Sequence, residues 1–331
     1  MIAFSGRPME LISTPQNPAP LGATVGALEI PRRFRRPLQV RYAHWPSGLK
    51  ERHGTVCIFP GRTEFIEKYF EVVGELRRRG FYVVAIDWRG QGGSTRLTRN
   101  PLKGHVRRFD DYQADLSRLM NDVVLPDCPP PYYVLAHSMG GAIALKAATM
   151  RGSWFERMVL TAPMIRIQGL PFSDVMTTKA TGLVSKLGFG RLAVPGGAKA
   201  YRQSQIFEDN ILTTDAERFA RNLSVLKAAP ELAVGTPTFG WVHAALTAMR
   251  EINDQEFPRR LRVPVVMLAA GNDRIVSNGA IETFADHFRL GSQIVLRGSE
   301  HEILQERDPI RQEFWAAFDA FVPGAKLKRS A

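Results

Sequence analysis

The segment 132–145, YYVLAHSMGGAIAL, constrains the fold of this chain more than any other part of the sequence. Its first half is apolar, aromatic and β-branched, which predicts a buried strand, and its second half has good helix propensity. Ser138 lies at the junction, with small residues two positions before it (Ala136) and two positions after it (Gly140). Such a strand–turn–helix needs small residues because the two backbones approach closely, and it exposes the serine as a nucleophile. The pattern differs from G-x-S-x-G by the methyl group of Ala136, and the alternative is a serine that only turns the chain.

The chain is long enough for one elaborated α/β domain, since it has 331 residues of which 44% are hydrophobic. No run of about 18 uncharged apolar residues occurs, so no transmembrane helix is predicted. Residues 1–20 lack a basic stretch followed by an apolar one, which argues against a signal peptide and favours a cytoplasmic protein. The two cysteines, Cys57 and Cys128, have no metal-ligand spacing, and neither a metal nor a cofactor is predicted.

The sequence is strongly basic, with a formal net charge of +12. Basic residues are concentrated at 32–41, 77–79 and 326–329. Such charge attracts nucleic acid or anionic lipid head groups, although a solvated surface is the more common role of each cluster taken alone. No nucleic-acid-binding module is recognisable, so nucleic acid is not a predicted partner. The oligomeric state is not predicted.

Short apolar runs alternate with helical patterns along most of the chain, which predicts an α/β fold with a mostly parallel central sheet flanked by helices. Strands are expected at 27–32, 38–45, 55–59, 82–86, 132–137, 157–163, 263–270 and 292–296. Helices are expected at 65–79, 110–124, 139–150, 279–288 and 308–321. After the sixth strand the rhythm changes, and helical patterns without a clean strand occur at 173–187, 215–227 and 240–253. We therefore expect a core of residues 1–163 and 258–331 with a helical lid, residues 164–257, inserted into it.

Side chains suited to nucleophilic catalysis follow the carboxyl ends of predicted strands, where functional groups gather in a parallel sheet. Ser138 is a weak nucleophile near pH 7 and needs a base, which itself needs an orienting carboxylate. His301 and Asp273 follow the last two predicted strands, and the chain order Ser, Asp, His is that of α/β-hydrolases. His137 neighbours the serine, but on a strand its side chain leaves from the opposite face. Asp87 also ends a strand, but it begins a glycine-rich loop, and we interpret it as the cap of that loop.

A tetrahedral intermediate also needs hydrogen-bond donors aimed at its oxyanion. The expected donors are the backbone N–H of Met139, directly after the serine, and that of Arg62, in the loop after the predicted strand 55–59. Gly61 and Glu64 would shape this loop. An ion pair between the side chains of Arg62 and Glu64 is the alternative role of these residues.

Several motifs together resemble one family of serine hydrolases. They are PGRTE at 60–64, DWRGQG at 87–92, GHV at 104–106, AHSMGG at 136–141, LTAPM at 160–164 and SEHEIL at 299–304. In this combination the chain is similar to the family that holds monoacylglycerol lipases and bacterial lysophospholipases, and closest to the bacterial lysophospholipase L2 type. That type resembles the chain in Pro-Gly at the oxyanion loop and in alanine before HSMGG, so Ala136 fits the resemblance. The likeness spans roughly residues 38–321 and includes lid motifs at 212–214, 218–223 and 235–242.

The resemblance implies an α/β-hydrolase that cleaves the acyl ester of a single-chain lipid, with a lysophospholipid as the expected substrate. By this analogy Ser138 attacks the acyl carbonyl, His301 transfers the proton, Asp273 orients His301, and the lid contributes an apolar acyl groove. The basic surface suits a substrate presented at an anionic membrane, so peripheral contact with the cytoplasmic face of the inner membrane is expected. Three alternatives stay open: a monoacylglycerol lipase or carboxylesterase, a lysophospholipid transacylase, and a non-catalytic α/β-hydrolase that only binds.

Overall fold

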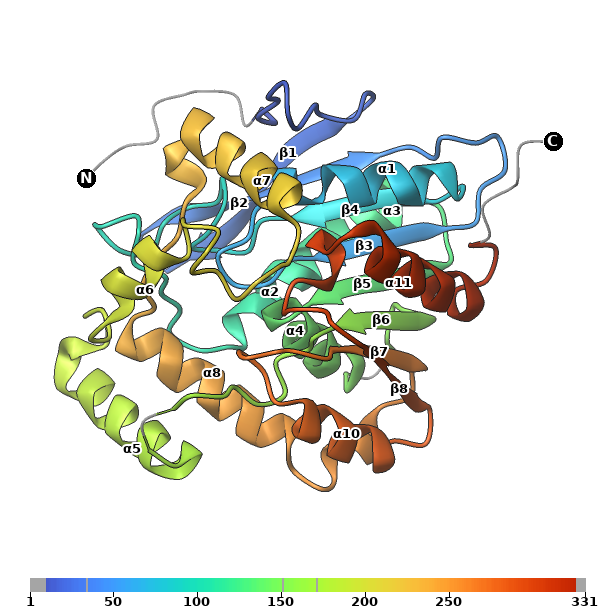
Figure 1. Cartoon of the computed structure of the whole chain (residues 1–331). Helices are drawn as coiled ribbons and strands as arrows, with labels where there is room; N and C mark the ends of the chain where they lie inside the picture. Colours follow the sequence, from blue (N-terminus) through green and yellow to red (C-terminus); the bar gives the residue numbers. More distant parts are fainter. Residues whose placement is uncertain (1–9, 34, 151, 171, 326–331) are drawn as a thin grey trace.

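The computed structural model describes residues 10–33, 35–150, 152–170 and 172–325, and its centre is one eight-stranded sheet. The strands are β1 (Thr24–Arg32), β2 (Arg35–Trp45), β3 (Thr55–Phe59), β4 (Tyr82–Ile86), β5 (Tyr132–His137), β6 (Arg157–Thr161), β7 (Val265–Ala270) and β8 (Gly291–Leu296). Their order across the sheet is β1-β2-β4-β3-β5-β6-β7-β8, with β1–β2 and β2–β4 antiparallel and the other pairs parallel. The predicted mostly parallel sheet is confirmed (Figure 1).

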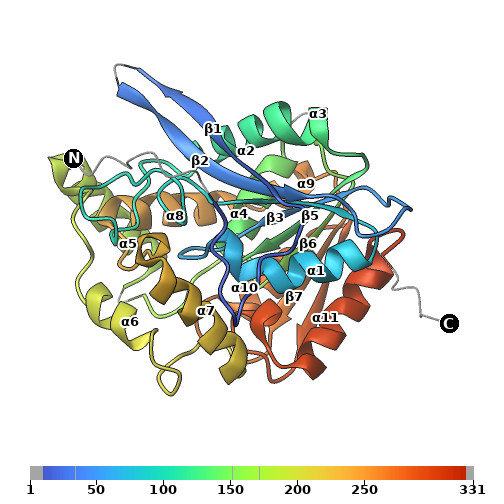
Figure 2. The ribbon, with the colours of Figure 1, turned by 90° about the horizontal axis from the view of Figure 1, so that it is seen from above.

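Helices cover both faces of this sheet (Figures 1 and 2). They are α1 (Phe70–Arg78), α2 (Asp111–Leu119), α3 (Leu125–Asp127), α4 (Met139–Ala148), α5 (Asp174–Val184), α6 (Gly197–Gln203), α7 (Ala216–Ala228), α8 (Phe239–Ile252), α9 (Phe257–Arg260), α10 (Asn278–Asp286) and α11 (Asp308–Phe321). Strand side chains alternate between two cores, because successive residues of a strand point to opposite faces. Cys57 and Phe59 of β3 point into the core shared with α2, α4, α8 and α10. Val56 and Ile58 point into the core shared with α1 and α11.

Two predicted boundaries differ from the structure for local reasons. β1 begins at Thr24 rather than at residue 27, because Gly26 is paired with Tyr42 of β2 and leaves room for the Tyr42 ring. The helix predicted at 110–124 changes after α2 into a π-helical turn, Met120–Val124. Pro126 follows this turn and has no N–H with which to continue the regular hydrogen-bond ladder.

The segment between β6 and β7 carries α5 to α9 and, in the part of the chain that is described, no strand of the sheet. α5 and α6 lie at the periphery of the molecule in both views (Figures 1 and 2). In contrast, α8 packs on α4, and its residues Trp241, Ala245 and Met249 belong to the same apolar core as Phe59. The last part of the segment is therefore integrated into the core, and the division of the chain into a core and a lid at residues 164–257 stays a prediction.

β1 and β2 project beyond the rest of the sheet as a two-stranded ribbon (Figure 2). The first basic cluster begins at the end of this ribbon, where Arg32 ends β1 and Arg35 begins β2, whereas Arg41 of the same cluster is buried and pairs with Asp87. None of the helices in the described ranges is long and apolar enough to cross a membrane. The basic cluster at 326–329 lies outside the described residues.

Candidate active site

Ser138 lies at a sharp turn between β5 and α4. Its φ and ψ angles are 49° and −113°, a strained conformation for a residue with a side chain. The Ser138 N–H donates to the Thr161 carbonyl of β6 at 3.0 Å, which fixes the turn. α4 then passes so close to β3 that a Cβ atom on Gly140 would lie 2.0 Å from the Phe59 carbonyl oxygen. Ala136 is buried and paired with Phe59 in the sheet, so the same close approach accounts for both small residues.

His301 connects Ser138 to Asp273 through two hydrogen bonds. His301 Nε2 lies 3.1 Å from Ser138 Oγ, and His301 Nδ1 lies 2.7 Å from Asp273 Oδ2. The N–H groups of Ile275 and Val276 donate to the other carboxylate oxygen at 2.8 and 2.9 Å. Burial alone would raise the pKa of Asp273, but His301 and these two N–H groups outweigh burial and lower the pKa. The carboxylate is therefore ionised near pH 7 and can orient the imidazole ring.

His137 packs beside His301 and has Thr161, not Ser138, as its hydrogen-bond partner. The ring centroids of the two histidines are 4.8 Å apart, and His137 Nδ1 lies 3.1 Å from the Thr161 hydroxyl oxygen. Burial lowers the pKa of His137 to about 4, so its ring is neutral near pH 7. Gly61 completes this packing, because a Cβ atom there would lie 2.9 Å from the His137 ring.

The loop after β3 is shaped by the buried carboxylate of Glu64. Glu64 Oε2 accepts hydrogen bonds from the Gly61 N–H and the Tyr69 hydroxyl, both at 2.5 Å, and Oε1 pairs with Lys68 Nζ at 2.9 Å. Burial would raise the pKa of Glu64, but Lys68 and the Tyr69 hydroxyl lower it to about 2. The ion-pair partner of Glu64 is thus Lys68, and the alternative pairing with Arg62 is not present among the described residues.

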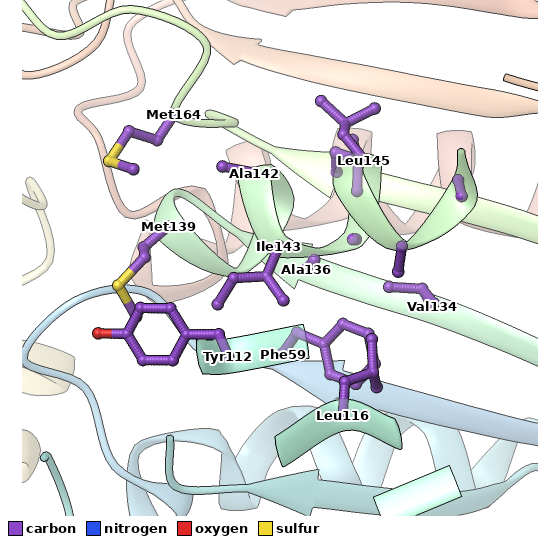
Figure 3. Packing of buried hydrophobic residues seen from close by; sticks show 14 of the residues in the cluster. Phe59, Tyr112, Leu116, Val134, Ala136, Met139, Ala142, Ile143, Leu145 and Met164 are labelled. Atoms are coloured by element: carbon purple, nitrogen blue, oxygen red, sulfur yellow. The ribbon is translucent and has the colours of Figure 1, made fainter. Parts of the chain in front are cut away.

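Arg62 and Met139 both have backbone N–H groups without an acceptor among the described residues. Met139 begins α4, where the first N–H groups of a helix have no partner within the helix. Its side chain belongs to the same apolar core as Tyr112 (Figure 3). The Arg62 side chain donates to the Gly235 carbonyl, and its guanidinium carbon lies 5.0 Å from the centroid of the Trp241 ring. The role of the two N–H groups as an oxyanion hole stays a prediction.

Asp87 lies at the end of β4 beneath the glycine-rich loop. Its Oδ2 accepts from the Gly93 N–H at 2.7 Å, and its Oδ1 accepts from the Ile66 N–H at 2.9 Å. Arg41 Nη2 pairs with the same carboxylate at 2.6 Å. Asp87 therefore connects the loop to its surroundings, and Ser138 is not among its hydrogen-bond partners in the described ranges.

Two buried charged residues near the site were not identified from the sequence. Lys68, which pairs with Glu64, also contacts Glu302 Oε1 at 2.5 Å. Glu302 directly follows His301, so this lysine links the loop after β3 to the loop that carries the histidine. The i, i+4 spacing of Glu64 and Lys68 was a usable signal. Glu302 gave none, because its partner lies 234 residues away in the sequence.

The His301 loop is also held by the segment that follows β6. The Glu302 N–H donates to the Leu212 carbonyl at 2.7 Å, and the Thr213 hydroxyl donates to the Gln305 carbonyl at 2.7 Å. The position of the histidine therefore depends on residues that lie far from it in the sequence.

A cavity of about 520 Å³ lies beside the site, lined by residues 166–170, 172–174 and 277–279. Gln168, on its wall, donates its side-chain amide to the Asp273 carbonyl at 3.2 Å. Ser138 does not line this cavity and is only 6% exposed. Among the described residues, no group of His, Cys, Asp and Glu side chains could hold a metal ion.

Known proteins resemble this chain over most of its length. Residues 50–308 match the serine aminopeptidase S33 family. The chain is 32% identical to lysophospholipase L2 of Escherichia coli (strain K12), over 83% of this chain and 81% of that protein. It is 27% identical to the probable lysophospholipase L2 of Haemophilus influenzae, over 87% of this chain and 90% of that protein.

Solved structures agree with the arrangement of strands and helices. A soluble variant of monoglyceride lipase from Saccharomyces cerevisiae, in complex with a substrate analogue, has a TM-score of 0.71. It covers 92% of this chain and 97% of its own at 17% identity, and it therefore supports the fold alone. The family expected from the sequence motifs is confirmed: this chain is a carboxylic ester hydrolase that belongs to the α/β-hydrolase family of lysophospholipases and monoacylglycerol lipases.

Proposed function

We propose that the protein hydrolyses the acyl ester of single-chain lipids through Ser138, His301 and Asp273. The observation that carries this proposal is the chain of hydrogen bonds from Ser138 Oγ through both ring nitrogens of His301 to Asp273. A serine hydroxyl becomes a nucleophile when a base accepts its proton and a carboxylate holds that base in the required tautomer.

In the proposed reaction, Ser138 Oγ attacks the acyl carbonyl carbon while His301 Nε2 accepts the hydroxyl proton. The backbone N–H groups of Arg62 and Met139 stabilise the oxyanion of the tetrahedral intermediate. The bond to the glycerol oxygen then breaks, and this oxygen leaves with the proton from His301. A water molecule, deprotonated by His301, attacks the acyl-enzyme, and the fatty acid leaves as the proton returns to Ser138 Oγ.

We propose a lysophospholipid as the substrate class. Two relatives that match this chain over most of its length are named lysophospholipase L2 and probable lysophospholipase L2. Monoglyceride lipases also occur among the relatives, so a monoacylglycerol is the second candidate. A panel of lysophospholipids and monoacylglycerols, assayed for released fatty acid, separates the two. Preference for monoacylglycerols across the panel would reject the first candidate, and acyl transfer to an added alcohol in excess of fatty acid release would identify a transacylase.

A fluorophosphonate probe tests the reaction class. We expect covalent labelling of Ser138, loss of labelling in Ser138→Ala, and unchanged labelling in the control Ser292→Ala, which alters an exposed serine on β8. A folded protein that remains unlabelled at Ser138 would be a binding module, and the proposed hydrolysis would be rejected.

We further propose that α5 contacts an anionic membrane surface. The helix packs with its polar side inward: Thr177 and Thr181 are buried, whereas Met176 and Leu183 are 58% and 60% exposed. Between residues 172 and 206 the only acidic residue is Asp174, and the basic residues are Lys179, Lys186, Arg191, Lys199 and Arg202. Exposed apolar and basic side chains on one surface favour a layer of anionic lipid. Sedimentation with neutral and with anionic liposomes tests this contact, and equal binding to both would contradict it.

We propose residues 164–257 as the lid of the site, with a substrate path that opens when part of this segment moves. Ser138 is buried beneath loops and helices, so an ester of a long-chain lipid reaches its Oγ only after such a movement. The cavity beside Asp273 marks the side on which residues 166–170 and 172–174 of this segment pack less closely.

A further inference from the structure

Arg62 carries a buried charge without a carboxylate partner. Its guanidinium donates to the Gly235 carbonyl and lies over the Trp241 ring, while its Nε atom is buried without an acceptor. No aspartate or glutamate in the described ranges forms an ion pair with it. Buried cations in proteins are normally paired, because an unpaired charge loses its hydration without compensation. Burial accordingly lowers the pKa of Arg62 to about 10.

A narrow crevice of about 190 Å³ surrounds the Arg62 side chain. Its lining includes Arg62, Arg89, Gln91, His105, Tyr112 and Trp241. Arg89 shows the usual arrangement of a buried arginine, because its Nη2 atom pairs with Asp115 at 2.6 Å. Arg62 is therefore the cation of this crevice whose charge is not balanced within the protein.

The crevice is lined by Arg62, one of the two residues that are proposed to hold the oxyanion. The Gln91 side-chain amide donates to the Gly61 carbonyl, next to Arg62, at 2.7 Å. Tyr112, which also lines the crevice, belongs to the same apolar core as Met139 (Figure 3). An anion bound beside the Arg62 side chain would thus lie next to a residue whose backbone N–H is proposed to hold the oxyanion of the ester.

We propose that the Arg62 guanidinium binds the head-group phosphate of a lysophospholipid, which enters this crevice beside the oxyanion loop. The inference rests on the proposed ester hydrolysis at Ser138. In a lysophospholipid a glycerol unit separates the ester from the phosphate, and in Arg62 an alkyl chain of similar length separates the backbone N–H from the guanidinium. One residue can therefore contact the oxyanion through its backbone and the phosphate through its side chain.

To bind the phosphate, Arg62 must give up its present contacts within the protein and form new ones with the phosphate oxygens. The crevice is too narrow in this structure for a water molecule, so the contacts with Gly235 and Trp241 open when the head group enters. Two parallel N–H···O bonds from a guanidinium to a phosphate are stronger than the neutral contacts that they replace. A monoacylglycerol presents a hydroxyl at this position and leaves the charge of the Arg62 guanidinium unpaired. This difference selects against the monoacylglycerol as a substrate.

The test compares two substrates that share one acyl chain, a lysophosphatidylethanolamine and a monoacylglycerol, in the same detergent micelles with the full-length enzyme. Arg62→Gln keeps the backbone N–H and removes the charge. We expect the ratio of kcat/KM for the lysophospholipid to kcat/KM for the monoacylglycerol to fall by about 10- to 100-fold. Arg62→Lys keeps the charge without the planar fork, so its ratio should lie between those of the wild type and Arg62→Gln.

Arg96→Gln is the matched control. Arg96 is partly buried and also lacks a carboxylate partner, and its guanidinium contacts the carbonyls of Glu231 and Ala233, close to Gly235 in the sequence. It does not line the crevice. Loss of the Arg96 guanidinium should therefore leave the ratio of kcat/KM for the two substrates unchanged.

Two results would overturn the proposal. If Arg62→Gln and Arg62→Lys slow both substrates equally, Arg62 only connects the oxyanion loop to residues 235–241. If inorganic phosphate inhibits the wild type but not Arg62→Gln, while the substrate ratio stays unchanged, the crevice binds a free phosphate ion and not a head group. A wild type that cleaves neither ester and stays unlabelled by the fluorophosphonate probe would instead reject the proposed function, and the inference with it.

Discussion

The small residues around Ser138 are required by close backbone contacts at the turn between β5 and α4, which we call the elbow. Gly140 faces the Phe59 carbonyl, and Gly141 faces Pro163, whose Cβ would lie 2.9 Å from an added Cβ atom. Ala136 precedes the turn on β5, where its methyl group is accommodated in the core. The elbow therefore tolerates one methyl group two residues before the serine, and the structure leaves no space for one two residues after it.

Gly140→Ala is expected to destabilise the protein by about 3 kcal/mol or more, because the added methyl group overlaps the Phe59 carbonyl. The matched control is Gly74→Ala in α1, where the nearest atom to an added Cβ is 3.6 Å away. That substitution should be neutral or stabilise by up to about 1 kcal/mol, because alanine favours the helix. Denaturant unfolding of both variants measures the difference, and equal stabilities would contradict the proposed steric cause.

Asp273→Asn should lower kcat by about 10³- to 10⁴-fold while the protein stays folded. The carboxylate accepts one hydrogen bond from His301 and two from backbone N–H groups, and an amide offers only one accepting atom for these donors. Steady-state hydrolysis of a soluble ester measures the effect. The exposed Asp286→Asn on α10 serves as control and should retain wild-type kcat. Retention of more than a tenth of kcat in Asp273→Asn would exclude Asp273 as the orienting carboxylate.

At the scale of a single element, α5 has its apolar side chains on the outside. The threonines on its inner face satisfy their hydroxyl groups within the helix, since Thr178 and Thr181 donate to the carbonyls of Asp174 and Thr177. Gly182 allows close contact with α8, because a Cβ atom there would lie 2.8 Å from the His243 ring. Close packing against α8 therefore needs no large apolar residue, and these residues remain available to contact lipid.

The double substitution Met176→Glu and Leu183→Glu should weaken binding to anionic vesicles by about tenfold or more, because it removes apolar contact and adds repulsion. Hydrolysis of a soluble short-chain ester should stay at the wild-type rate. Leu290→Glu is the control, since Leu290 is 49% exposed but lies after α10 and away from this segment in the sequence. Vesicle sedimentation measures both variants, and equal loss in the control would mean that charge alone determines binding.

The elements that the sequence predicted well are those with a strong local pattern. β3, β4 and β5 are continuous apolar runs, and α7 and α8 have clear helical periodicity, so each lies within a few residues of its expected position. The proximity of Ser138, Asp273 and His301 also followed from local information, because all three come after carboxyl ends of strands. The contact of Lys68 with Glu302 and the contact of Arg62 with Gly235 could not be predicted. Both depend on loops that meet only in the folded chain.

For the molecule as a whole, one glutamate joins elements from three distant parts of the chain. Glu71 of α1 pairs with Arg218 and Arg221 of α7 at 2.7 and 2.8 Å and with Arg311 of α11 at 3.2 Å. Burial would raise the pKa of Glu71, but the hydrogen bonds and charges of these arginines lower it to about 2. This cluster holds α7 against the body of the protein, next to the loop that carries His301.

Glu71→Gln should lower the free energy of unfolding at pH 7 by about 2 kcal/mol, which is less than the full pKa shift would give because the side chain is 25% exposed to solvent. The folded-state pKa lies below the ordinary value of 4.5, so the stabilisation is complete above that value and is lost as pH falls toward 2. Thermal unfolding of wild type and variant between pH 7 and pH 2 checks this, and the difference should disappear at the acid end. Glu217→Gln, at an exposed position of α7, should show no such pH-dependent difference.

The integration of α8 into the main core has a consequence for how such a protein diversifies. α8 and the contacts of residues 212–213 with the His301 loop are two fixed anchors, and residues 166–168 form a third through their hydrogen bonds with residues 273–277. Residues 172–209, between this third anchor and residues 212–213, carry α5 and α6. This stretch behaves as an exchangeable cassette: it can lengthen, shorten or change its outer face without moving Ser138, Asp273 or His301. Substitutions in this stretch can therefore change which substrate is preferred, while the residues proposed for ester hydrolysis stay in place.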